Sequence, residues 1–255
     1  MKNKSLFFFS WSIFIYCTIA NSSGNPESFT NPWYPIIGIS GGVLSTSNMG
    51  KYQIFPIQNP DTDELYIYSP NHQKQTHGLF ELFVGVERPA FSNWLLQFGL
   101  AYSQASSYRS HGIFSQGADI DSSDQYTYNY FLGEKELLGQ TKFMYSYLKK
   151  FYPYFLVGLG ISSNKASDFS TNVPPFLTFT RNYQDNNNHS FAYKAGVGID
   201  MNVYQHVRIG LGYRFSNLGH VSLGTGNIDG TLMNGTLAQT HLYANELLFQ
   251  LTYII

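Results

Sequence analysis

Eight segments of this chain place an apolar or aromatic residue at every second position, with small or polar residues between them. A repeat of two residues is the period of a β-strand with two unlike faces, whereas a helix repeats every 3.6 residues. The segments span about 33–44, 77–87, 93–104, 136–147, 153–163, 190–201, 206–216 and 242–255. The chain is therefore predicted to be all-β.

The links between these segments alternate between short and long. Short links with turn chemistry are expected at Arg88-Pro89-Ala90, Lys149-Lys150-Phe151 and Asn202-Val203-Tyr204. Four long polar loops, expected to lack secondary structure, span about 45–76, 105–135, 164–189 and 217–241. An even number of strands with long loops at one end is typical of outer-membrane barrels, and unusual in compact soluble domains. We predict a closed antiparallel eight-stranded transmembrane β-barrel with three short periplasmic turns and four long extracellular loops.

The composition indicates which strand face meets lipid. Charged residues make up only 12% of the chain, about half of the ~25% usual in soluble domains. The second strand face consists largely of Gly, Ala, Ser and Gln, which would solvate a soluble, ligand-holding barrel poorly. We therefore expect the apolar face to point outward into lipid. A formal net charge of −1 argues against a nucleic-acid partner.

The N-terminus has the pattern of an export signal. Lys2 and Lys4 precede the apolar stretch Leu6–Ala20, which ends in small residues. We predict a signal peptide at 1–20, a short periplasmic arm at 21–32, and the barrel at 33–255. Since the only cysteine, Cys17, lies in the signal, neither disulfides nor thiol metal sites are expected in the mature chain.

Charged residues on the inward face form the main candidate site. They are expected to balance four against four in an ion network, because unpaired charges are costly in a narrow interior. The set is Glu81, Glu87, Asp200 and Glu246 with Lys142, Lys194, Arg208 and Arg214. Such a network either fills and stiffens the lumen or lines a narrow, selective pore.

The C-terminus carries a family pattern. Apolar residues alternate at Leu247, Phe249, Leu251, Tyr253 and Ile255. Outer-membrane barrels end in such a strand, usually closed by Phe where this chain has Ile, and the barrel assembly machinery reads it. From Tyr213-Arg214-Phe215 through the stretch 241–247, the sequence resembles small surface-antigen barrels of the opacity-protein and porin-like, outer-membrane protein A-like superfamily, as in Legionella and Coxiella. That resemblance implies an eight-stranded barrel in the bacterial outer membrane and little chemistry.

Three further sets of residues are candidates for catalysis, metal binding or adhesion. His220 and Ser222 resemble the His-x-Ser element of lipid A deacylases, with Asp229 or Glu246 as the carboxylate partner. A cation could lie among Asp61, Asp63, Glu64, His72 and His77. Aromatic residues of the loops would form an adhesive surface or pack the loops together; they are Tyr66, Tyr68, Tyr108, Phe114, Phe169, Phe176 and Phe179. We expect none of these sets to be catalytic or metal-binding, and no cofactor.

The sequence thus predicts a monomeric surface protein with a side-chain-filled lumen, acting structurally or through its loops. Its expected partners are the bilayer and lipopolysaccharide, the assembly machinery, and host surface molecules reached by the loops. A narrow small-molecule conduit is the first alternative, and a lipid-modifying enzyme is the second.

Overall fold

The computed structural model describes residues 33–46, 51–59, 62–71, 74–117, 123–174, 181–228, 231–239 and 241–255. The predicted signal peptide and periplasmic arm lie outside these ranges. Within them, no helix has the length and apolar character needed to cross a bilayer.

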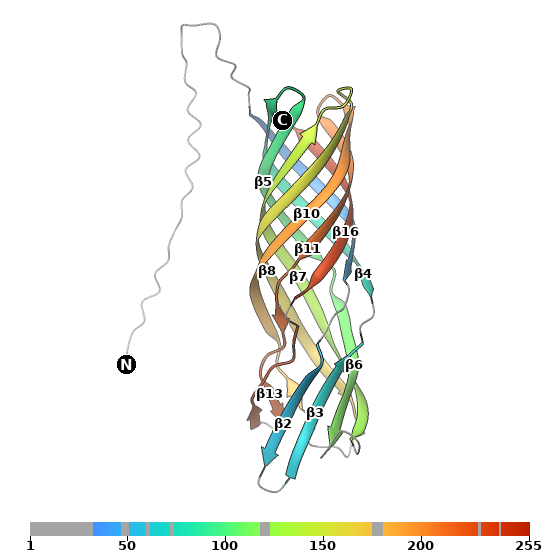
Figure 1. The fold of residues 1–255 in the computed structure, drawn as a ribbon, viewed down its shortest axis with the longest axis vertical. Helices are drawn as coiled ribbons and strands as arrows, with labels where there is room; N and C mark the ends of the chain where they lie inside the picture. Colours follow the sequence, from blue (N-terminus) through green and yellow to red (C-terminus); the bar gives the residue numbers. More distant parts are fainter. Residues whose placement is uncertain are drawn as a thin grey trace, which may run out of the picture. The chain divides into compact units, whose positions relative to one another are not determined.

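Eight antiparallel strands form a hydrogen-bonded ring (Figure 1). They are β1 (Tyr34–Thr46), β4 (Gln75–Phe91), β5 (Trp94–Ala105), β7 (Asp124–Tyr145), β8 (Phe151–Asn172), β10 (Asn186–Tyr204), β11 (Val207–Asn217) and β16 (Tyr243–Ile254). Around the ring the order is β7-β5-β4-β1-β16-β11-β10-β8, and the β7–β8 pairing closes it. All eight predicted segments are confirmed as strands of this ring.

Two of the short turns lie further along the chain than predicted, and the third overlaps the predicted turn at Lys149-Lys150-Phe151. They are Ser92-Asn93 between β4 and β5, residues 146–150 between β7 and β8, and Gln205-His206 between β10 and β11. The predicted turns at Arg88-Pro89-Ala90 and Asn202-Val203-Tyr204 are both wrong, because β4 continues to Phe91 and β10 continues to Tyr204. Pro89 pairs with Leu95 just before a register shift in the ladder, a position where proline is tolerated. We call this side of the ring the turn end.

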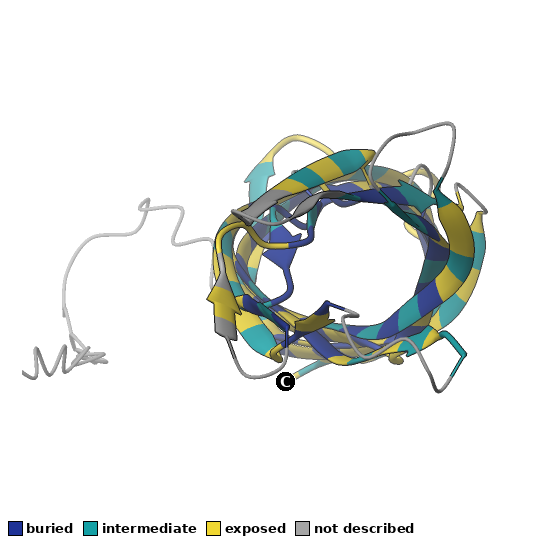
Figure 2. Ribbon diagram, turned by 90° about the horizontal axis from the view of Figure 1, so that it is seen from below, coloured by how far each residue is buried: buried dark blue, intermediate teal, exposed yellow. Residues whose placement is uncertain are grey.

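Buried residues alternate with more exposed ones along most of each ring strand, as the ribbon coloured by burial shows (Figure 2). On β16 the exposed side chains are Tyr243, Leu247, Phe249, Leu251 and Tyr253, and the buried ones are Ala244, Glu246, Leu248, Gln250 and Thr252. The other ring strands repeat this pattern and give an outward apolar belt. Exposed aromatic pairs border it, with Trp94 against Tyr145 at the turn end and Phe215 against Tyr243 at the opposite end. The outward apolar face predicted from composition is confirmed.

The long loops are not structureless, and that prediction is wrong. β2 (Gln53–Asn59), β3 (Thr62–Pro70) and β6 (Tyr108–Gly117) continue the sheet along β7, beyond the ring. Four short strands follow β11, namely β12 (Val221–Ser222), β13 (Gly226–Ile228), β14 (Thr231–Met233) and β15 (Ala238–Gln239), and β9 (Asn182–Tyr183) pairs with β13. β7 and β8 each have 22 residues, roughly 70 Å when extended, whereas about 9–11 tilted residues cross a bilayer.

We call β2, β3, β6 and the adjoining halves of β7 and β8 the extension, and its side of the ring the extended end (Figure 1, lower part). Tyr66, Tyr68, Tyr108 and Phe114 are buried in its core. Of the two alternatives for these aromatic residues, packing of the loops together is therefore confirmed at these positions, and the exposed adhesive surface is not formed by them. Phe169 packs against the same core, and Phe176 and Phe179 lie outside the described residues.

Candidate functional site

The structure places all eight predicted interior charges on the buried face of the ring. Glu81 and Glu87 come from β4, Lys142 from β7, Lys194 and Asp200 from β10, Arg208 and Arg214 from β11, and Glu246 from β16. Every one of them is at most 5% exposed. Because these strands surround the lumen, contacts between the side chains cross its interior.

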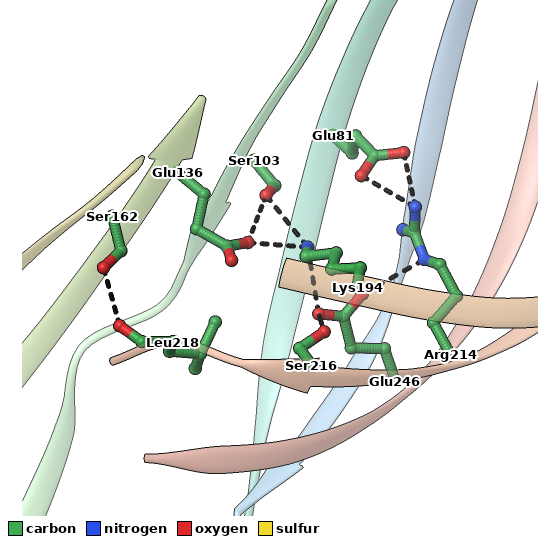
Figure 3. Close-up of polar contacts among 9 residues, drawn as sticks. All are labelled: Glu81, Ser103, Glu136, Ser162, Lys194, Arg214, Ser216, Leu218 and Glu246. Carbon is green, nitrogen blue, oxygen red and sulfur yellow. Dashed lines mark hydrogen bonds and ion pairs between the residues drawn. The ribbon is translucent and has the colours of Figure 1, made fainter. Parts of the chain in front are cut away.

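The layer nearest the extended end is a linked network of ion pairs (Figure 3). Glu246 bridges two cations, with Lys194 Nζ at 3.0 Å and Arg214 Nε at 3.1 Å. Arg214 also reaches Glu81 on the far strand at 2.9 Å. Lys194 Nζ lies 2.6 Å from Glu136, a residue of β7. The network therefore joins four strands besides β10, on which Lys194 lies.

Two further layers lie toward the turn end. In the middle layer, Lys142 Nζ contacts Asp200 at 3.1 Å, donates to Gln250 at 2.9 Å, and sits 4.1 Å from the centroid of the Tyr154 ring. A Cβ atom at Gly198 or Gly212 would come 2.4 Å from the Tyr154 hydroxyl. Glycine at those two positions makes room for this ring inside the lumen.

The layer at the turn end is an arginine clamp. Arg208 donates two hydrogen bonds to Glu87, one of them 2.9 Å long, and its Nε donates to Asn202 at 2.8 Å. Gln97 donates to the same carboxylate at 2.7 Å. The Arg208 guanidinium also lies 4.5 Å from the centroid of the Tyr152 ring. Together the three layers place paired side chains across the interior of the ring.

Two interior acids, Glu134 and Glu136, were missed by the sequence analysis. Both are buried on β7, on the same face as Lys142. Their even numbers continue the alternation that places Lys142 inside. Glu136 opens the predicted segment 136–147 and could have been assigned from that alternation, whereas Glu134 needed the strand to begin two residues earlier. They change the four-against-four balance, because the described interior holds six acids in these layers against four cations.

Arg181 is a second residue that sequence reasoning missed. It lies within the aromatic core of the extension at 1% exposure, with its guanidinium 4.4 Å from the Phe55 ring centroid and 5.0 Å from that of Tyr183. Its Nη2 donates to the carbonyls of Asn234 and Gly235. Burial raises the pKa of the neighbouring Tyr68 well above its ordinary value, so this phenol remains neutral. The cation is thus held by rings and carbonyl groups.

His77 joins the extension to the ring. It lies on the inner face just beyond the apolar belt and stacks on Tyr108, with 4.2 Å between ring centroids. The Tyr108 hydroxyl donates to Glu134. Burial lowers the pKa of His77, which keeps the imidazole neutral at pH 7.

Acidification should therefore weaken the protein through His77. A histidine whose pKa is lowered by folding binds fewer protons in the folded state, so stability falls as pH drops through the unfolded value of about 6.5. As pH is lowered from 8 to 5, we expect the denaturant concentration at the unfolding midpoint to decrease more, or to increase less, in the wild type than in His77→Phe, which preserves the stack. Denaturant titrations at three pH values measure this. His189→Gln, at an exposed position on β10, is the control, and an unchanged pH slope in His77→Phe would contradict the prediction.

The remaining candidates are not assembled by the structure. Ser222 Oγ lies 3.3 Å from both Asn188 Oδ1 and Asn186 Nδ2. The His220 contacts in the described structure run through its backbone N and O. Asp229 lies outside the described residues, and Glu246 is engaged by Lys194 and Arg214.

The proposed cation set cannot be placed as a whole, because Asp61 and His72 lie outside the described residues. Within the described ranges, no group of three or more His, Cys, Asp or Glu side chains is placed to hold a metal ion.

The alternating C-terminal residues lie on the outward face of the last ring strand, β16, and at Ile255 directly after it. They are Leu247, Phe249, Leu251, Tyr253 and Ile255, and each is exposed. β16 pairs with β1 on one side and β11 on the other, and the Ile255 amide donates to the Pro35 carbonyl at 2.9 Å. Recognition of this strand by the assembly machinery stays a prediction.

Comparison with known proteins gives one family. Residues 37–242 match the family model described as outer membrane protein beta-barrel domain. Comparison with curated protein sequences finds no match.

Three solved structures illustrate the similarity. Neisserial surface protein A is 11% identical, with 86% of this chain and 96% of that chain covered and a TM-score of 0.41. The outer membrane protease OmpT from Escherichia coli is 12% identical, with coverage of 90% and 99% and a TM-score of 0.46. Ail, the attachment invasion locus protein of Yersinia pestis, is 12% identical, with coverage of 88% and 99% and a TM-score of 0.39. Identities this low say nothing about what this chain binds or acts on.

Proposed function

Because this chain belongs to the outer membrane protein β-barrel domain family, we propose that it is a non-conducting surface protein of the bacterial outer membrane. In this proposal the ring spans the bilayer, the turn end faces the periplasm, and the extension stands outside the cell. Its role is structural, or one of surface interaction through the extended end. A cleaved signal peptide at 1–20 would supply export.

The observation that carries this proposal is the linked network of Glu81, Glu136, Lys194, Arg214 and Glu246. These side chains come from five strands and meet inside the ring at distances of 2.6–3.1 Å. Conduction would require water to pass this layer and also the two layers that lie toward the turn end. Separating buried ion pairs costs several kcal/mol, so a continuous path is costly to open.

The extension supports a role at the cell surface. Its buried aromatic core and ladder pairing hold β2, β3 and β6 on the ring strand β7. A sheet that continues well beyond the bilayer needs a reason other than spanning it, and presentation of a surface above the membrane is the simplest one. Host surface molecules are the partners we propose for that surface.

One observation favours the alternative of a narrow conduit. Three buried acids each have an oxygen without a hydrogen-bond partner among the described residues, namely Glu134 Oε2, Glu136 Oε1 and Asp200 Oδ1. Buried polar atoms of this kind often bind ordered water. Together with the excess of acids, they would favour cations in any path that exists.

Single-channel recording in planar bilayers separates the two functions. The sample is refolded protein whose gel mobility shifts on boiling, which shows that the barrel has formed. We expect no discrete conductance steps, while a general porin added afterwards to the same bilayer gives steps and validates the recording. Reproducible cation-selective steps from the folded protein would contradict the closed lumen and establish the conduit.

A further inference from the structure

The ring wall has a gap where β5 gives way to β6 along β7. β5 pairs with β7 as far as Gln104 opposite Lys135, and β6 resumes the pairing with Tyr108 opposite Leu132. Gly133 and Glu134 therefore lack a ladder partner on this edge. A pocket of about 330 Å³ lies here, lined among others by Gln104, Ser107, Gly133, Lys135, Ser163 and Lys165.

The pocket lies at the border of the apolar belt. Along the outward face of β7, going toward the extended end, exposed Leu137 is followed by exposed Lys135. On the paired strand β8, exposed Ile161 is followed by Ser163 and then exposed Lys165. The outward surface changes from apolar to basic and hydroxylic within one residue pair on both strands. In a bilayer this level holds lipid headgroups.

Two lysines flank the pocket on neighbouring strands. Lys135 is opposite Ser163, and Lys165 is opposite Gly133, so the two lysines are diagonal neighbours on one face, roughly 7–8 Å apart at Cα. Between them Gly133 contributes no side chain, and a Cβ placed there would meet only Ser107 Oγ, at 3.5 Å. An anion that binds in the open space between these two positive charges would be attracted by both of them.

The other polar groups at the pocket are compatible with an anion. Asp185 lies 3.6 Å from Lys165, but both side chains are more than half exposed, and exposed pairs of this kind are weak. Asn187 also lines the pocket, and its oxygen accepts from Ser163 Oγ at 2.9 Å. The Glu134 carboxylate is buried and accepts from Tyr108.

We propose that this pocket binds a phosphate group of an anionic lipid in the outer leaflet. The ammonium groups of Lys135 and Lys165 would contact the phosphate oxygens. The hydroxyl and amide groups that line the pocket would supply further hydrogen bonds. The acyl chains would lie against the apolar belt, on the turn-end side of the pocket. This site does not depend on whether the lumen conducts, although it does require the outer-membrane location.

Native mass spectrometry of the refolded protein in zwitterionic detergent tests the proposal. The probes are diphosphoryl lipid A and its dephosphorylated counterpart. We expect one diphosphoryl lipid per barrel, and at least about tenfold weaker binding by Lys135→Gln/Lys165→Gln, because charged hydrogen bonds are lost. Gly133→Val should weaken binding similarly by filling the space.

Gly139→Val is the matched control. It lies on the same strand and face, within the belt, where an added Cβ would meet only the Leu159 carbonyl, at 3.7 Å, so binding should be unchanged. Equal retention of the dephosphorylated glycolipid, or full affinity in the lysine and Gly133 variants, would overturn the proposal. Inorganic phosphate that binds as tightly as the lipid would assign the pocket to a free anion and also overturn it.

Discussion

Glu246→Gln should lower the free energy of unfolding by about 3–5 kcal/mol, the usual cost of breaking a buried ion pair from one side. Glu246 is fully buried and is shared by Lys194 and Arg214. Glutamine has nearly the same shape, so packing is preserved while the negative charge is lost. Two cations then face each other without the anion that separates them, although Lys194 still has Glu136 and Arg214 still has Glu81.

Urea titration in detergent micelles, run in both the folding and unfolding directions, measures this change. Trp33 and Trp94 provide the fluorescence signal. Lys165→Gln is the control because it removes one member of the exposed pair with Asp185, which should cost less than about 1 kcal/mol. A loss below 1 kcal/mol in Glu246→Gln would mean that the interior network adds little to stability. The strength of these ion pairs would then not explain a closed lumen.

The ring was predictable because its two faces differ in chemistry. Leu247, Phe249 and Leu251 alternate with polar or inward residues, and a shift of one residue would bury the wrong set. The same alternation located Arg214 and Glu246 on the inner face. It did not specify partners, because pairing across a lumen depends on strand order and stagger, which a single sequence does not encode locally.

The extension was missed for a different physical reason. Its strands alternate too, with Tyr126, Tyr128 and Tyr130 on one side of β7, but the intervening residues are Thr and Asn and the stretch resembles a polar loop. Tyrosine combines an apolar ring with a polar tip, so its burial depends on neighbours supplied from far along the chain. Tyr68 on β3 is one such neighbour, 5.3 Å from the Tyr128 ring centroid. Arg181 was unpredictable on the same ground, since its partners are carbonyl groups and rings.

Phe114→Ala should open the extension and leave the ring intact. Phe114 is fully buried and packs on Tyr68 and Tyr126, with ring centroids 5.7 and 5.6 Å apart. Removing a buried phenylalanine side chain costs about 3–5 kcal/mol. β6, which carries it, pairs with β3 and with the part of β7 beyond the ring. The cost should therefore appear as local opening.

Hydrogen–deuterium exchange resolved by peptide tests this prediction. Amides of β3 and β6 should exchange at least about a hundredfold faster in Phe114→Ala, since each 1.4 kcal/mol is a factor of ten. Amides of β11 and β16 should keep their wild-type rates. Ile113→Ala is the matched control, because Ile113 neighbours Phe114 on the opposite, exposed face of β6. Faster exchange throughout the ring would show that the extension and the barrel unfold as one unit, and the extension would then be part of what stabilises the spanning structure.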